Sequence, residues 1–143
     1  MSEASNGVDD IFLKIIADEI PAAKIYEDEQ TVAFLDINPN NKGHALVIPR
    51  VKFRNIFDTD SNVLGHMMEV AQKIARAQKE ALGADGVNIV MNNEAPAGQE
   101  VFHAHIHVIP RFAEDGIFSH SKHTTYSEGE MATVAERLKN SLH

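Results

Sequence analysis

The 143-residue sequence contains no cysteine and no tryptophan, and it has no long apolar run. The absence of cysteine excludes a disulfide framework and any metal site built on thiolates. No apolar stretch approaches the roughly 20 residues that a membrane-spanning helix requires. The N-terminal segment MSEASNGVDD is polar and acidic, unlike a signal peptide or a basic transit segment. We therefore expect a cytoplasmic protein that contacts no membrane.

Basic residues are also scarce, because 13 lysines and arginines face 21 aspartates and glutamates, for a formal net charge of −8. Such a surface repels polymeric nucleic acid, whose binding depends on basic side chains that release counterions from phosphates. A single nucleotide is not excluded, because backbone N–H groups and histidines can hold a phosphate without net basic charge. The hydrophobic content of 43% predicts one globular domain over residues 10–143, preceded by a disordered arm over residues 1–9.

The predicted order of elements is helix, three strands, long helix, two strands and helix, which favours an α+β fold. Asp10 caps a short first helix that Pro21 ends. The longest helix should span residues 61–82, with Gly83 as its C-terminal cap. The expected strands cover residues 24–27, 31–36, 44–48, 87–91 and 102–109, and a capping-box pattern at residues 127–130 predicts the last helix. We expect a five-stranded antiparallel sheet with the long helix packed on it, plus short N-terminal and C-terminal helices.

The most informative segment is FHAHIHVIP over residues 102–110, in which His103, His105 and His107 alternate with apolar residues. Alternate side chains of a strand share one face, so the pattern predicts three neutral imidazoles on one side of the sheet. Neutral imidazole is a nucleophile near pH 7, because its ordinary pKa is about 6.5. An acceptor must hold the second ring nitrogen as N–H, so that the attacking nitrogen keeps its lone pair. Three imidazoles suit neither a core nor a plain surface.

Histidines two residues apart on a strand are also common zinc or copper ligands, so a metal-binding module using the triad and His44 is an alternative. Metal sites of that kind normally recruit a carboxylate or a thiolate as well. The only acids close upstream of the triad are Glu94 and Glu100. They lie in the loop NNEAPAGQEV over residues 92–101. Gly98 would let a phosphate approach the backbone closely, so this loop is a candidate phosphate-binding site.

Four separated segments resemble the histidine triad (HIT) family: DIFLKIIADEIPAAKIYEDE, TVAFLDINP, GHALVIPR and GQEVFHAHIHVIPR. The last of them is similar to the family signature, in which three histidines alternate with apolar residues. The likeness extends over roughly residues 10 to 112. It implies a homodimer with a joined ten-stranded sheet, a purine-nucleotide pocket on each subunit, and neither a cofactor nor a catalytic metal.

The resemblance also implies a role for each matching residue. His105 is the nucleophile that forms a nucleotidyl-histidine intermediate, which water later hydrolyses. His107 contacts phosphate oxygens and assists the leaving group. His103 orients His105 through its backbone carbonyl, and His44 supports the triad from a neighbouring strand. The nucleotide contacts are Asp36 at both ribose hydroxyls, Ile11, Phe12, Ile15, Phe34 and Ile37 around the purine, and Asn92, Gly98, Gln99 and the backbone of Glu100 around the phosphates.

Ordinary structural roles would also fit some of these residues. The apolar stripe near the N-terminus is what any core-facing helix shows. Asp36 could instead cap the turn before Pro39. The position of Glu100 holds Ser or Thr in some relatives, where the hydroxyl bonds phosphate. Because a carboxylate would repel a phosphate, only the N–H of Glu100 should face it.

The implied activity is hydrolysis or transfer at the α-phosphate of a purine nucleotide, with an AMP-like product. The N-terminal half is more similar to nucleoside phosphoramidate hydrolases. Gln99 and the ending Ile109-Pro110-Arg111 resemble dinucleoside polyphosphate hydrolases. A non-catalytic nucleotide sensor of the same fold is a further alternative.

The sequence departs from many bacterial relatives at their structural zinc site. Those relatives hold the zinc partly through a Cys-x-x-Cys pair near the N-terminus, and the corresponding positions here are Asp10 and Leu13. A further histidine position of that zinc type corresponds to Lys52. We therefore predict that this chain has no structural zinc.

Overall fold

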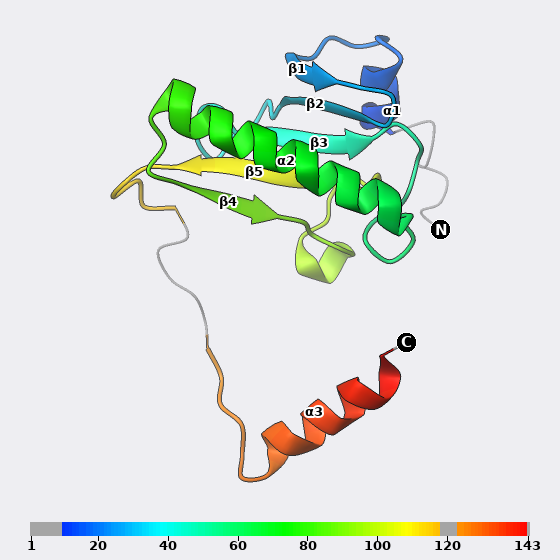
Figure 1. The fold of residues 1–143 in the computed structure, drawn as a ribbon, viewed down its shortest axis with the longest axis vertical. Coiled ribbons are helices and arrows are strands. Elements are labelled where there is room, and N and C mark those ends of the chain that lie inside the picture. The colour runs from blue at the N-terminus through cyan, green and yellow to red at the C-terminus, as the bar shows by residue number, and fades with distance from the viewer. Residues whose placement is uncertain (1–9, 118–122, 143) are drawn as a thin grey trace.

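A computed structural model describes residues 10–117 and 123–142 of the chain. The disordered arm predicted over residues 1–9 lies outside the described residues. Five strands form one antiparallel sheet in the order β1-β2-β3-β5-β4 (Figure 1). The strands are β1 (Lys24–Glu27), β2 (Thr31–Leu35), β3 (Ala45–Pro49), β4 (Gly86–Val90) and β5 (Ile106–Arg111), and the α-helices are α1 (Ile11–Ile16), α2 (Ser61–Leu82) and α3 (Glu130–Ser141). The predicted α+β class is confirmed.

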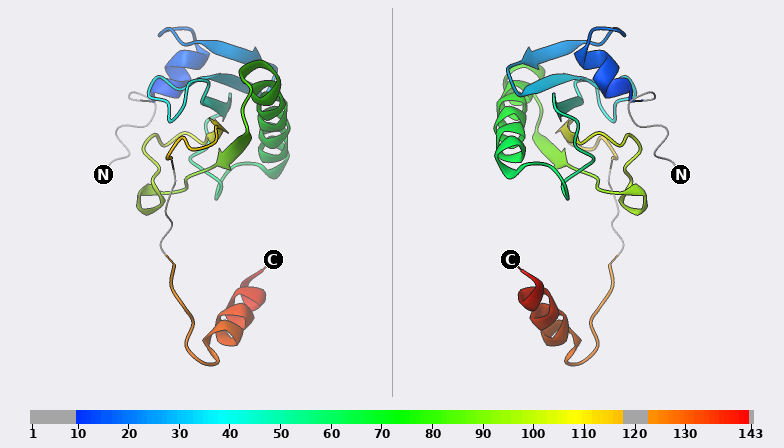
Figure 2. Two further views of the ribbon diagram at one scale, coloured as in Figure 1. Left: turned by 90° about the vertical axis from the view of Figure 1, so that its left-hand side faces the viewer. Right: turned by 90° about the vertical axis from the view of Figure 1, so that its right-hand side faces the viewer.

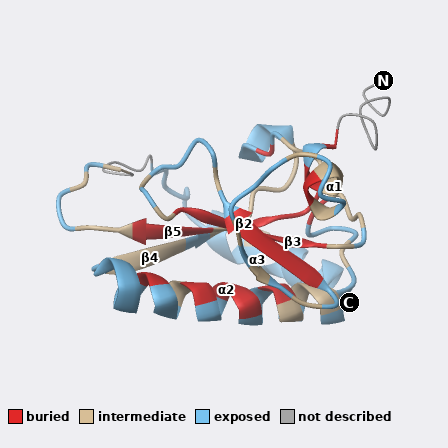
Figure 3. Ribbon diagram, turned by 90° about the horizontal axis from the view of Figure 1, so that it is seen from above, coloured by how far each residue is buried: buried red, intermediate tan, exposed pale blue. Residues whose placement is uncertain are grey.

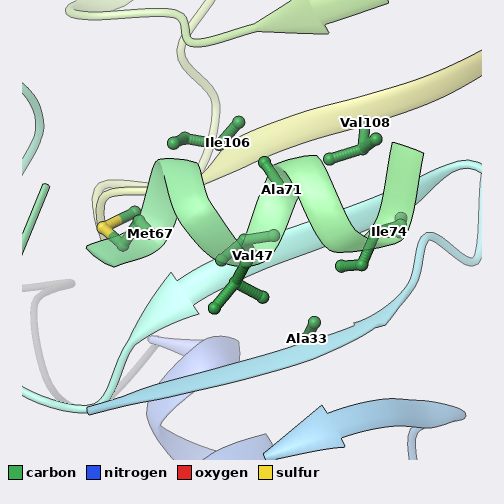
Figure 4. Packing of buried hydrophobic residues seen from close by; sticks show 9 residues of the cluster. Ala33, Val47, Met67, Ala71, Ile74, Ile106 and Val108 are labelled. Atoms are coloured by element: carbon green, nitrogen blue, oxygen red, sulfur yellow. The ribbon is translucent and has the colours of Figure 1, made fainter. Parts of the chain in front are cut away.

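Helix α2 covers one face of the sheet, and α1 lies on the other (Figure 2). The Asp60 carboxylate caps α2 at its start, and Gly83 ends it with a φ of 70°, so the predicted bounds of this helix are confirmed. Its buried side chains face the sheet, whereas its outer side is exposed (Figure 3). The core on this face consists of Met67, Val70, Ala71 and Ile74 of α2 packed on Ala33, Ala45, Val47, Ile106 and Val108 (Figure 4).

A second, smaller core lies on the α1 face of the sheet. Phe12 and Ile15 of α1 pack there against apolar side chains of β2 and β3, namely Val32, Phe34, Leu46 and Ile48. Leu46 pairs with His107 across the β3–β5 ladder. Directly paired residues point to the same face of a sheet, so the His107 side chain lies on the α1 face. The candidate site must therefore be found beside α1.

Strand β5 differs from its predicted extent, since it begins at Ile106 rather than near residue 102 and continues through Pro110. Before Ile106 the chain leaves the sheet, and the Ala104 N–H donates to the Phe53 carbonyl at 2.8 Å. The Pro110 carbonyl accepts from Asn41 Nδ2 on the β3 side of β5, beyond the last β3–β5 pair at Val108. Proline is tolerated at this position because β3 has no carbonyl to which a backbone N–H of residue 110 would donate.

The two edges of the sheet are not alike. Strand β1 pairs with β2 with a register irregularity between Lys24 and Tyr26, and Lys24 forms an ion pair with Asp18. Strand β4 pairs regularly with β5 along its whole length and exposes Ile89. Helix α3 stands apart from the sheet, and none of its residues is buried (Figure 1). Among residues 10–117 and 123–142, no helix has the length and apolar character needed to cross a membrane.

Candidate active site

A cavity of about 520 Å³ opens on the α1 face of the sheet. Twelve of the fourteen residues predicted from the sequence line it: Ile11, Phe12, Ile15, Phe34, Asp36, Ile37, His44, Asn92, Gly98, Glu100, His105 and His107. The prediction did not name eight further lining residues: Ile20, Pro21, Ala22, Leu35, Asn38, Asn40, Leu46 and Val101. Leu46 could have been found, because it alternates with Val47 on a strand that packs on both faces. His103 and Gln99 do not line the cavity.

His105 has one ring nitrogen bound and the other free. Its Nδ1 lies 2.7 Å from the His103 carbonyl oxygen, which can only accept, so Nδ1 carries the hydrogen. Nε2 of the neutral ring therefore keeps its lone pair. Within the described part of the chain, no hydrogen-bond partner meets this Nε2. Phe12 packs edge-on against the ring, with ring centroids 5.0 Å apart.

A chain of hydrogen bonds fixes the ring hydrogens of His44 and His107. The Asn40 backbone N–H donates to His44 Nδ1 at 3.0 Å, so the hydrogen of neutral His44 resides on Nε2. That Nε2 lies 2.9 Å from His107 Nδ1, to which it donates. His107 in turn carries its hydrogen on Nε2 and lines the cavity. The cavity thus has a lone pair at His105 and an N–H donor at His107, whose ring centroids are 5.0 Å apart.

These three imidazoles are held in their neutral forms. Burial lowers the pKa of His107 to about 4, and the neighbouring His105 and His44 act in the same direction. Burial also lowers the pKa of His105 below its ordinary 6.5, against the opposing effect of the hydrogen bond to the His103 carbonyl. For His44, burial lowers the pKa and the Asp36 carboxylate opposes the shift. Near pH 7 the three rings are therefore neutral rather than cationic.

Asp36 caps a turn and also lines the cavity. Its Oδ1 accepts from the Asn38 N–H at 2.8 Å, which is the turn cap before Pro39. Its Oδ2 lies 3.6 Å from His44 Nε2, and the residue lines the cavity. One carboxylate oxygen thus shapes the turn, and the other is directed to the histidines.

The His103 ring lies on the α1 side of the sheet, edge-on to Phe12 with ring centroids 5.8 Å apart. Unlike His105 and His107, it does not line the cavity. Its side chain is fully buried, with Nδ1 3.0 Å from Asp10 Oδ2 and Nε2 2.9 Å from the Pro49 carbonyl. Both partners only accept, so the ring carries both hydrogens and a positive charge. Only the His103 carbonyl takes part at the cavity.

The loop over residues 92–101 is held in a fixed shape beside the histidines. Gly98 has a φ of 98°, which favours glycine. The Gln99 side chain is buried away from the cavity, where Oε1 accepts from Asn55 Nδ2 and the Glu94 N–H, and Nε2 donates to the Arg54 and Val101 carbonyls. The structure thus places the Gln99 side chain in support of the loop rather than at a phosphate position. This difference arises because the amide is already fully hydrogen-bonded.

Glu94 adopts an unusual backbone conformation in this loop, with φ 82° and ψ 157°. Such a conformation costs about 1–3 kcal/mol in a residue other than glycine. Arg54 binds the Glu94 carboxylate through Nε at 3.0 Å and Nη2 at 2.8 Å, and Asn55 donates to it as well. These hydrogen bonds lower the pKa of Glu94 to about 2. Contacts outside the cavity therefore hold the loop in this conformation, and no pattern in the sequence indicates this network.

Among residues 10–117 and 123–142, Asp36, His44 and His107 form a group of side chains that could hold a metal ion, since their ligand atoms lie within 4.8 Å of one another. Asp36 supplies the carboxylate that the sequence did not reveal beside the triad. The ring hydrogens do not favour this use, however. A metal on His44 Nε2 would move the hydrogen of that ring to Nδ1, against the Asn40 N–H that now donates to it. The hydrogen-bonded chain accounts for the geometry without a metal.

The positions that correspond to the structural zinc ligands of bacterial relatives do not fit a zinc ion. Leu13 has no ligand atom, and Lys52 presents an ammonium group. The Lys52 Nζ contacts Asp10 Oδ2 in a close ion pair. A cation already occupies the carboxylate that could have bound the metal.

Comparisons with known proteins agree with this geometry. The HIT domain model matches residues 17–114. The crystal structure of a HIT family member from Bacillus subtilis is 38% identical, with a TM-score of 0.85 over 93% of this chain and 96% of that one. A zinc-bound histidine triad family protein from Mycobacterium smegmatis is 35% identical, with a TM-score of 0.75 over 94% and 99% of the two chains. The adenylylsulfatase HINT3 of Arabidopsis thaliana is 40% identical over 111 residues, which are 78% of this chain and 56% of that protein. The chain therefore belongs to the HIT family.

Proposed function

We propose that this protein is a nucleotide hydrolase that cleaves a phosphoramidate or phosphoanhydride bond at the α-phosphate of a purine nucleotide. The observation that carries the proposal is the His105 ring, whose Nδ1 is held by the His103 carbonyl at 2.7 Å while Nε2 is free at the cavity. A neutral imidazole in this tautomer is ready to attack phosphorus. Asp36 is the ribose ligand in this proposal, and the apolar side chains of α1 and β2 hold the base.

In the first step, the His105 Nε2 lone pair forms a bond to the α-phosphorus as the bond to the leaving group breaks. The leaving group departs with the electron pair and takes up a proton from solvent. Positive charge develops on the imidazole and is met by the His103 carbonyl, which accepts from Nδ1–H. The His107 Nε2–H donates to a phosphate oxygen or to the leaving group, where charge grows in the transition state.

In the second step, water attacks the same phosphorus atom of the nucleotidyl-histidine. The P–N bond breaks, and its electron pair returns to His105 Nε2. The hydroxyl group of the water stays on the phosphorus, and its second proton passes to solvent. The products are a nucleoside monophosphate and the protonated leaving group. No step requires a metal, and activity should persist in excess chelator.

Three substrates that differ in their leaving group fit this chemistry, and one experiment compares their rates. Adenosine phosphoramidate is the substrate that we favour, a diadenosine polyphosphate is the alternative, and adenylyl sulfate is added because one relative is an adenylylsulfatase. The value of kcat/KM should be measured for all three under one condition, and the intermediate trapped by acid quench and mass spectrometry of the His105 peptide. Tight AMP binding without turnover of any of them would support a nucleotide sensor and refute the hydrolase.

The pH dependence of kcat/KM should reflect the neutral form of His105. The pKa of His105 lies below its ordinary 6.5, so lowering the pH from 8 to 7.5 should leave the nucleophile uncharged and the rate almost constant. The acid limb should be centred below pH 6.5, where Nε2 becomes protonated. Circular dichroism over the same range separates this loss from unfolding. An acid limb centred at or above pH 7 would contradict the buried, neutral nucleophile.

We also propose that the protein is a homodimer in which two β4 edges join the sheets. The support is the regular, uncovered β4 edge with its exposed Ile89. Light scattering coupled to size-exclusion chromatography should give twice the 15.8 kDa mass of the chain. Ile89→Lys should shift the mass toward that of one chain, whereas Ile25→Lys on the irregular β1 edge should not. A monomer at all concentrations would contradict this assembly.

A further inference from the structure

Asp10 joins three separate segments of the chain at one buried carboxylate. Its side chain is 1% exposed. Oδ1 accepts from the N–H groups of Phe12 and Leu13 at 2.9 and 3.1 Å, which caps α1. Oδ2 accepts from His103 Nδ1 at 3.0 Å and from the Lys52 ammonium group. One residue therefore ties α1 to the segment after β3 and to the segment before β5.

The charges of this cluster are arranged around the Asp10 carboxylate. Burial alone would favour the neutral acid, but the hydrogen bonds from His103 and Lys52 outweigh it and lower the pKa of Asp10 well below its usual range. His103 is a cation by its two acceptor contacts, and Lys52 is a second cation beside the same oxygen. Burial of charged groups costs free energy that pairing need not fully offset. We infer that this cluster is retained because it holds a specific geometry.

Two contacts connect this cluster to His105. The His103 carbonyl accepts from His105 Nδ1. The His103 ring is itself held by hydrogen bonds to Asp10 and to the Pro49 carbonyl, which fix the position of its backbone carbonyl. Phe12, two residues after the Asp10 cap, packs edge-on against both rings, with centroids 5.8 Å from His103 and 5.0 Å from His105. A change at Asp10 would therefore reach the nucleophile through its hydrogen-bond acceptor and through its packing partner.

We propose that the Asp10–Lys52–His103 cluster is a metal-free brace that orients His105, with Asp10 as a positioning residue. Two of its residues, Asp10 and Lys52, stand at positions that by resemblance correspond to zinc ligands of bacterial relatives, and here the Lys52 ammonium provides the positive charge. The proposal rests on the proposed function for its kinetic consequence. The orientation of the His105 ring, in contrast, can be measured without any turnover.

Asp10→Asn is the decisive variant, because asparagine caps a helix as well as aspartate does but has an NH2 donor in place of the charged Oδ2 that accepts from His103 and Lys52. We expect kcat to fall about 10–100-fold, as it does when outer residues that orient a reacting group are lost, with KM changed less than about threefold. Lys52→Met should act in the same direction with a smaller effect. Asp18→Asn is the matched control, since Asp18 is 81% exposed near the other end of α1 and should change neither value.

Nitrogen-15 NMR of the histidine rings at pH 7.5 provides the second readout. In the wild type, His105 should show a protonated Nδ1 and an unprotonated Nε2. In Asp10→Asn, a mixture of the two tautomers is expected. An unchanged His105 tautomer with unchanged kcat would overturn the proposal, even if the melting temperature fell, because the cluster would then only stabilise the fold.

Metal content separates the remaining outcomes. The wild-type protein should keep its melting temperature and its His105 spectrum after dialysis against a chelator. A stoichiometric metal whose removal disturbs either property would overturn the metal-free brace. If the wild type turned over none of the substrates, the proposed function would fail, and the NMR comparison would still decide whether Asp10 orients His105.

Discussion

His105→Ala is expected to lower kcat by about 10⁴-fold or more, because the variant lacks the Nε2 atom that forms the covalent intermediate in the proposed reaction. Binding of AMP should remain within about threefold of the wild type, since Asp36 and the apolar lining of the cavity are retained. Isothermal titration calorimetry measures the affinity, and stopped assays on adenosine phosphoramidate measure the rate. The nucleotidyl mass on the peptide that contains residue 105 should disappear.

The control for this variant is His66→Ala. His66 lies on α2, where its Nε2 contacts Asp28 at 2.6 Å, and it does not line the cavity. It should therefore retain wild-type kcat, even if the lost contact reduces stability. Wild-type turnover by His105→Ala would refute the nucleophile, and with it the proposed reaction.

His107→Ala should lower kcat by about 10²–10³-fold, the usual effect of removing one hydrogen-bond donor from a transition state. The donor in question is the Nε2–H that the chain from Asn40 through His44 directs toward the cavity. His107→Gln keeps an N–H group on a side chain of similar reach, so it should be at least about tenfold faster than the alanine variant. Steady-state kinetics with both variants test the donor role.

The choice of substrate shows where the His107 hydrogen is needed. An amine leaving group requires a proton as it departs, whereas sulfate leaves as a stable anion. If His107 assists departure, the alanine variant should lose more activity on adenosine phosphoramidate than on adenylyl sulfate. Equal losses on the two substrates would place the hydrogen bond on a phosphate oxygen. Wild-type rates on both would contradict any role for His107 in the reaction.

Local signals in the sequence were sufficient for most of the fold. Helix α2 was predicted with its bounds, because an apolar stripe and Gly83 mark it in the sequence itself. The beginning of β5 was not, because the three alternating histidines are compatible with a continuous strand. Whether that strand is extended upstream depends on the Ala104 N–H, which finds the distant Phe53 carbonyl instead of a ladder partner. Nothing near residue 104 in the sequence indicates this contact.

The cavity was predicted more completely than the contacts that hold it. Most residues that line the cavity lie in the segments that resemble the family, so their positions could be carried over one by one. The supporting interactions join residues far apart in the chain, such as Asp10 with His103 and Arg54 with Glu94. For the same reason, Gln99 was placed at the phosphates, although the structure commits its amide to the loop. Pairings of this kind depend on tertiary structure and have no local pattern.

The irregular register of β1 limits how far chains of this protein can associate. A strand whose hydrogen-bonding groups are out of step, and which carries the charged Lys24, is a poor template for another strand. If one edge of each sheet is consumed by a twofold contact, the opposite edges of the pair cannot recruit further copies. Association would then stop at a closed, symmetric particle rather than continue into a fibre. A single misaligned residue pair at the periphery of the sheet would thus protect the protein at high concentration.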